Sequence, residues 1–171
     1  MERSALTSLA PGDAAVALRS LPRRFRESFR APELAGEPAA LDPAAVPRSG
    51  GPSPLGLVLG ASRALDGMRR AIDRTLASDS PALDGTVFDR EARDRLSEAS
   101  GSIGGALAAL EGSVEALAAD LDRAPLKDWA RPATVGGQRV DALELLKEAL
   151  ASARTYLDRL GPTLESLRRE T

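Results

Sequence analysis

The stretch SPLGLVLGASRALDGMRRAIDRTLA, residues 53–77, has the pattern of one long amphipathic helix. Ser53 can cap the helix, and Pro54 suits its first turn, where the missing N–H of proline has no partner to lose. The apolar residues then recur at spacings of three and four: Val58, Ala61, Leu65, Met68, Ile72 and Leu76. This spacing predicts a helix over residues 55–77 with one buried face.

The residues before this stretch predict another helix over residues 14–29, with Asp13 as its N-cap. Its apolar face repeats every four residues through Ala17, Leu21, Phe25 and Phe29. Pro22 interrupts the pattern, so either the helix kinks there or a second helix begins there. Residues 31–54 hold six of the twelve prolines and predict a long connection: a crossover packed on the bundle, a lid or a disordered tether.

A third helix is predicted over residues 90–121, where an apolar residue recurs every seven positions: Leu96, Ile103, Leu110 and Leu117. Four glycines fall inside this range, and each costs about 1 kcal/mol relative to alanine in a helix. They are Gly101, Gly104, Gly105 and Gly112. Two explanations stay open. Either the helices pack closely at these glycines or the helix breaks near residues 100–105, or else the glycines form a hollow shaped for a ligand.

Asp141 and Glu144 form a capping-box pair that predicts the start of the last main helix, residues 142–160. Gly161-Pro162 is expected to end this helix, which leaves residues 161–171 as a C-terminal extension with a short helix of its own. Before it, residues 123–140 contain Gly136-Gly137 and predict a turn or a short hairpin.

Together these elements predict an all-α four-helix bundle that forms a single domain over residues 1–171, with the Pro/Gly-rich connection between its first two helices. Alanine and leucine dominate the apolar residues, which favours helices. The expected core includes six residues: Leu65, Ile72, Ile103, Leu110, Leu150 and Leu157.

The composition excludes several kinds of site. The sequence has no cysteine and no histidine, so it cannot supply a thiolate nucleophile, an imidazole base or a sulfur-imidazole metal site. A net charge of −2 gives no electrostatic case for nucleic acid or an anionic membrane, and the cluster Arg19, Arg23, Arg24, Arg26 and Arg30 is interpreted as a solvated face. No membrane span or signal peptide is expected, which predicts a cytoplasmic protein.

Two stretches, SPLGLVLG at residues 53–60 and DWARPATVGG at residues 128–137, resemble the DinB-like superfamily of four-helix bundles. That superfamily includes mycothiol-dependent maleylpyruvate isomerases and related thiol S-transferases. The resemblance implies three histidine ligands for a divalent metal, one on the second helix and two on the last. These positions fall here at Ala61, Ser152 and Tyr156, or at Ala151 and Thr155 if the last pair is shifted by one residue, so no metal and no cofactor is expected.

Three carboxylates near the expected cavity, Asp66, Glu148 and Asp158, could offer oxygen ligands. Glu148 and Asp158 are ten residues apart on one helix, about 15 Å, and therefore cannot share an ion.

The first function hypothesis is a binding or interaction module for an apolar small molecule or a protein, with a cavity lined by Ala61, Arg63, Ser152 and Tyr156. The second is a metal-independent isomerase or transferase that uses the same cavity, with Asp66 and Arg154 as further polar groups and Tyr156 as a general acid. A homodimer without a ligand is the third, and a metal-dependent thiol S-transferase comes last. An open polar cavity would favour an enzyme, whereas a filled interior would favour a protein partner.

Overall fold

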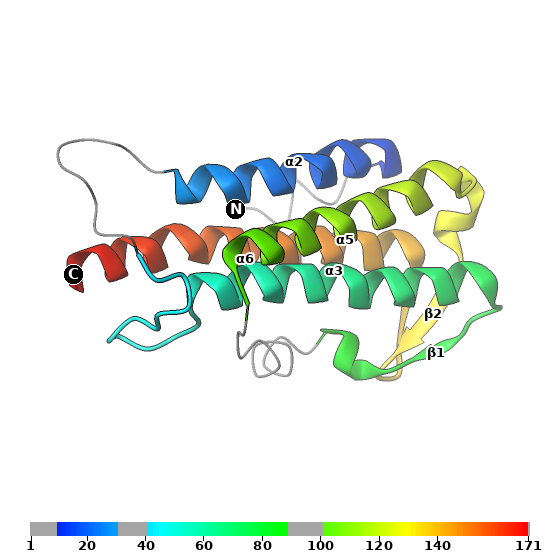
Figure 1. Cartoon of the computed structure of the whole chain (residues 1–171). Helices are drawn as coiled ribbons and strands as arrows, with labels where there is room; N and C mark the ends of the chain where they lie inside the picture. The colour runs from blue at the N-terminus through cyan, green and yellow to red at the C-terminus, as the bar shows by residue number, and fades with distance from the viewer. Residues whose placement is uncertain (1–9, 31–40, 89–100, 171) are drawn as a thin grey trace.

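The computed structural model describes residues 10–30, 41–88 and 101–170. Four long helices form a bundle in this part of the chain, and a small sheet covers one end of it (Figure 1). The helices are α2 (Pro11–Phe29), α3 (Pro54–Ala77), α5 (Ile103–Arg123) and α6 (Ala142–Glu170). None of the helices within these ranges is long and apolar enough to cross a membrane.

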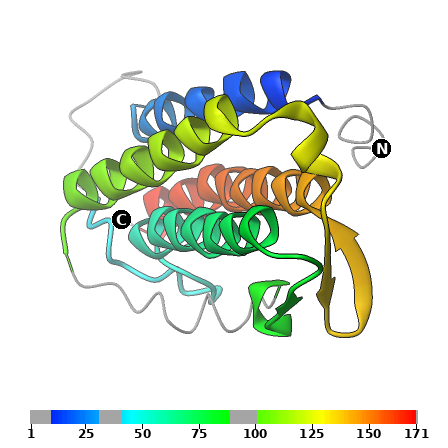
Figure 2. The same cartoon turned by 90° about the vertical axis from the view of Figure 1, so that its right-hand side faces the viewer.

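Helix α3 confirms the prediction from residues 53–77. The Ser53 hydroxyl accepts a hydrogen bond from the backbone N–H of Gly56 at 3.0 Å, and Pro54 occupies the first turn. Leu65, Met68 and Ile72 are fully buried on its apolar face. The helix packs against both α5 and α6 (Figure 2).

Helix α2 begins at Pro11, and its N-cap residue Ala10 makes no side-chain capping bond, so Asp13 lies in the first turn and is not the cap. Pro22 lies inside one continuous helix, and no second helix begins there. Helix α2 packs against α5 and α6. Two ion pairs join it to α5: Arg19 to Asp122 at 2.6 Å and Arg26 to Glu111 at 2.5 Å.

Helix α5 begins at Ile103: the Ser102 side chain caps it, and Gly101 just before the cap has a positive φ of 132°, which favours glycine. The first part of the predicted helix, residues 90–100, lies outside the described residues. Gly104, Gly105 and Gly112 are exposed, so they line neither a ligand hollow nor a close helix contact. Ile103 is only partly buried, which corrects its place in the core.

Helix α6 starts as predicted, with reciprocal hydrogen bonds between Asp141 and Glu144 at 2.8 and 2.9 Å. It does not end at Gly161-Pro162 but continues to Glu170. A proline inside a helix costs about 3 kcal/mol, whereas burying a leucine contributes about 1.5–3 kcal/mol. Leu164 and Leu167 are both buried beyond Pro162, and their burial offsets the cost of continuing the helix.

The sheet is larger than the predicted hairpin. Strands β2 (Pro132–Val135) and β3 (Gln138–Asp141) form the antiparallel hairpin, and Gly136 and Gly137 supply the positive φ angles of its turn. Strand β1 (Ala82–Leu83) adds a parallel edge on β2. The short helices η1 (Gly85–Phe88) and η2 (Leu126–Ala130) lie next to the sheet in the sequence, and no other strand occurs in the described ranges.

The directions of the helices show which connection crosses the bundle. Helices α3 and α5 run in the same direction, opposite to α2 and α6 (Figure 1). The end of α2 and the start of α3 therefore lie at the same end, so the Pro-rich connection does not have to cross the bundle. The end of α3 and the start of α5, in contrast, lie at opposite ends of the bundle (Figure 1).

The described part of the Pro-rich connection, residues 41–53, is packed on the bundle. The carbonyl of Pro43 accepts a hydrogen bond from the Leu55 N–H, and Pro47 is buried. The N–H of Arg48 donates to both carboxylate oxygens of Glu170 at 3.1 Å, so the end of α6 holds this loop.

Candidate functional site

The interior of the bundle is closed where α3 passes α6, at Gly60 and Tyr156. The Tyr156 side chain is among the largest fully buried side chains, with 1% exposure. A Cβ placed on Gly60 would lie 2.6 Å from Cε1 of Tyr156 and 2.9 Å from its Cζ. Only a glycine permits this contact, so the ring lies directly against the backbone of α3.

The structure brings three of the four predicted cavity residues into the interior. Ala61 is fully buried, Ser152 is 2% exposed and Tyr156 is 1% exposed. Arg63, in contrast, is exposed, because it falls on the other side of α3 from Ala61 and Ala64. It therefore does not line the interior.

The other predicted polar groups do not converge on one point. Asp158 is exposed and pairs with Arg154 at 3.8 Å, while Glu148 is half-buried and accepts a hydrogen bond from Ser152 at 3.4 Å. Asp66 is half-buried on α3. Across the described ranges, no group of three or more acidic side chains could hold a metal ion.

The donors present at the implied metal position do not fit the metal that the resemblance implies. Ala61 offers a methyl group, Ser152 a hydroxyl and Tyr156 a phenol, which are poor ligands for zinc or nickel at neutral pH.

The buried hydroxyls of Ser62 and Ser113 are 2.8 Å apart and bond to each other, and Ser113 also donates to the carbonyl of Ala109. These polar groups therefore join α3 to α5.

A second feature lies at the sheet end of the bundle, where α3, α5 and η2 enclose an open depression of about 440 Å³. Its lining combines charged and apolar side chains: Arg69, Asp73, Leu76, Asp120, Arg123, Ala124, Pro125 and Asp128. Leu126 on η2, next to Pro125 in the sequence, is 79% exposed.

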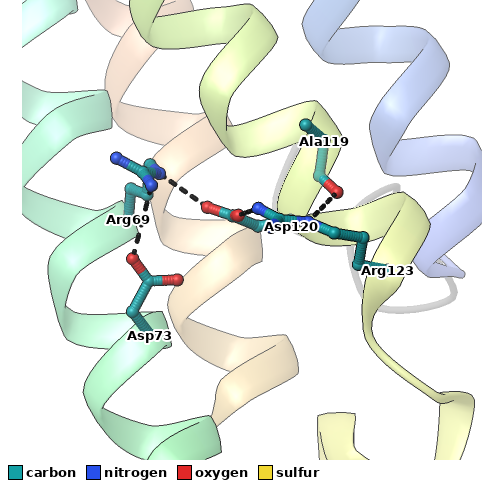
Figure 3. A network of polar contacts seen from close by, with 5 residues as sticks. All are labelled: Arg69, Asp73, Ala119, Asp120 and Arg123. Atoms are coloured by element: carbon teal, nitrogen blue, oxygen red, sulfur yellow. Dashed lines mark hydrogen bonds and ion pairs between the residues drawn. The ribbon is translucent and has the colours of Figure 1, made fainter.

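Four charged residues of the depression form one network centred on Asp120 (Figure 3): Arg69, Asp73, Asp120 and Arg123. The Asp120 side chain is only 8% exposed and lies between two guanidinium groups. Arg69 donates through Nε at 2.6 Å, and Arg123, one turn further along α5, donates through Nη2. Asp73 is 3.7 Å from Arg69 on the same face of α3. The network thus joins the second half of α3 to the end of α5.

Burial raises the pKa of the Asp73 carboxyl, and the negative charge of Asp120 raises it further. Arg69 and Arg123 act in the opposite direction but do not reverse the shift. The hydrogen bond to Asp120 raises the pKa of Arg69, which stays charged. Asp73 is therefore a carboxylate whose ionisation is disfavoured by its surroundings.

The sequence interpretation missed this network, although one signal for it was present. Asp120 follows Leu117 by three residues, so it falls on the apolar face of α5, and an acidic residue on a buried face requires a partner. The partner could not be identified, because Arg69 lies 51 residues earlier in the chain.

No model of a protein family matches the sequence, and no curated protein is similar to it in sequence. The fold is similar to that of YfiT from Bacillus subtilis, described as a probable metal-dependent hydrolase with an unusual four-helix bundle topology. The match has a TM-score of 0.71 at 15% identity and covers 94% of this chain and 87% of YfiT. It confirms the predicted fold, a four-helix bundle, and shows that its topology matches that of YfiT.

Proposed function

We propose that this chain is a binding module on the DinB/YfiT-like fold that works without a catalytic metal. The packing of Tyr156 against Gly60 carries the proposal, since the ring fills the interior next to Ala61 and Ser152. A metal centre there would need several strong donors directed at one open point, and these side chains do not provide them.

The filled interior also favours a binding module over an enzyme that uses the same cavity. Acid-base catalysis in the bundle would require polar side chains that reach a substrate in open space. The buried hydroxyls of Ser62 and Ser113 bond to each other instead. A partner or ligand is therefore expected to bind at the surface of the bundle.

Elemental analysis of untagged protein, purified without chelators, tests this function. We expect no stoichiometric metal, and zinc, nickel or manganese at one ion per chain would overturn the proposal. Native mass spectrometry of the same preparation would detect a copurifying ligand. Tyr156→Phe is the matched control variant, because it keeps the ring against Gly60 and removes only the hydroxyl. We expect this variant to retain any ligand that copurifies with the unmodified protein.

A further inference from the structure

The depression at the sheet end of the bundle has an apolar side and a charged side. Leu76, Ala124 and Pro125 supply hydrocarbon surface from α3 and from the segment that follows α5. Asp73 and Asp128 supply carboxylates in the same lining. A ligand that matches both sides needs a hydrocarbon stem and a polar head.

The charge balance of the lining determines the sign of the charge on the polar head of the ligand. Asp120 is held by both guanidinium groups, so it is already compensated. The full lining has three carboxylates against two guanidiniums, which leaves a net charge of −1. A monovalent cation would neutralise the depression, whereas an anion would add to the excess.

The excess negative charge of the depression is least compensated at Asp73. Its carboxylate is partly desolvated and lies near Asp120, and its raised pKa records that the negative charge is unfavourable there. A cation bound beside Asp73 would stabilise the ionised form. Ordinary ion pairing does not remove this cost, since Arg69 is shared with Asp120 at a shorter distance, 2.6 Å against 3.7 Å.

Resting on the binding role proposed above, we infer that this depression binds an aliphatic cation. Its ammonium or guanidinium head would pair with Asp73 and Asp128, and its stem would pack on Leu76, Ala124 and Pro125. The same chemistry is present in a free alkylamine and in a lysine or arginine side chain of a protein partner. The exposed Leu126 lies beside the depression in the sequence, where a protein partner could contact it.

Titration of ¹⁵N-labelled full-length protein with n-pentylamine, followed by NMR, tests the inference. We expect saturable shifts at the amides of Asp73, Ala124 and Asp128, and weaker binding at higher salt. The neutral n-pentanol has the same stem and is expected to bind at least about tenfold more weakly. Equal binding of the two probes, or shifts that do not saturate, would overturn the inference.

Two variants and one matched control locate the contact. Asp73→Asn and Asp128→Asn should each weaken pentylamine binding by about tenfold, while both keep the size of the side chain. Glu115→Gln removes an exposed carboxylate from α5 outside the depression and should leave the affinity unchanged. An equal loss in Glu115→Gln would show non-specific attraction and would contradict the site. Circular dichroism checks that each variant is folded.

A tripeptide with one central lysine, capped at both ends, distinguishes the two sources of the cation. Binding at least about tenfold tighter than pentylamine, lost when the lysine is acetylated, would identify a protein side chain as the ligand. Binding no tighter than pentylamine would identify a free amine. Stoichiometric metal overturns the proposed function, whereas a metal-free protein that does not bind pentylamine overturns only the amine site.

Discussion

Gly60 and Arg69 are nine residues apart on α3, yet these two parts of the helix contact their neighbours in opposite ways. At Gly60 the backbone touches the Tyr156 ring of α6, with no room for even a methyl group. At Arg69 the side chain reaches Asp120 of α5 across the edge of an open depression. The first contact packs a ring tightly against a backbone, and the second leaves charged groups accessible. Within the described ranges, α3 is therefore tightly packed at Gly60 and borders an open charged depression at Arg69.

Removal of the ring tests the packed region most strongly. Tyr156→Ala should lower the free energy of unfolding by about 3–5 kcal/mol, because it removes a fully buried aromatic side chain and leaves a cavity. Chemical denaturation followed by circular dichroism measures the loss. A change below about 1 kcal/mol would show that the region between α3 and α6 is loosely packed.

Loss of the central carboxylate tests the charged region. Asp120→Ala should cost about 1.5–3 kcal/mol, because it leaves Arg69 and Arg123 without their shared partner. Arg123→Ala is the milder comparison, since this side chain is 73% exposed. If both variants lost the same stability in denaturant titrations, Asp120 would not be the centre of the network.

A methyl group added at Gly60 tests the contact with Tyr156 directly. Gly60→Ala should destabilise the protein by about 1–3 kcal/mol through the clash with Tyr156, although alanine is the better helix former. In a Tyr156→Leu background the same substitution should be neutral or stabilising. A double-mutant cycle from thermal melts measures this coupling, and additive effects would refute a direct contact.

The smallest expected effect is a gain in stability, whereas the preceding substitutions lower it. The pKa of Asp73 is raised in the folded protein, so its ionised form destabilises the fold above that pKa, and the penalty disappears as pH falls below the pKa of the unfolded chain. Asp73→Asn should therefore raise the melting temperature slightly at neutral pH, by less than about 1 kcal/mol in free energy. The difference should vanish in melts at acidic pH. A destabilising effect at neutral pH would contradict the cost assigned to this carboxylate.

The sequence predicted the features that depend on neighbouring residues. Ser53-Pro54 and the pair Asp141 and Glu144 located two helix starts, because caps act within one turn. The helix end expected at Gly161-Pro162 was wrong, because burial of Leu164 and Leu167 offsets the local cost of proline. Strand β1 was missed, since its two residues pair with residues about 50 positions later.

At the candidate site too, local patterns could be predicted from the sequence, whereas contacts between helices could not. Ala61 is buried on the apolar face that the helical periodicity of residues 55–77 predicts. Ser152 and Tyr156, which only the resemblance placed at the site, are buried as well, whereas Arg63 is exposed. The contact between Gly60 and Tyr156 depends on how α3 and α6 approach each other, which a single sequence does not specify. The network of Arg69 and Asp120 likewise required the structure, because an interhelical partner has no local signal.

The order of the helices has a consequence for the nascent chain. Helix α3 packs most extensively against α6, and strand β1 pairs with β2, so both partners are made only after α5. Until residues 142–170 leave the ribosome, the face of α3 that packs against α6 has no partner to cover it. A ribosome-bound intermediate that ends after α5 should therefore expose a continuous apolar stripe, the kind of surface that chaperones bind and that aggregates when synthesis stalls.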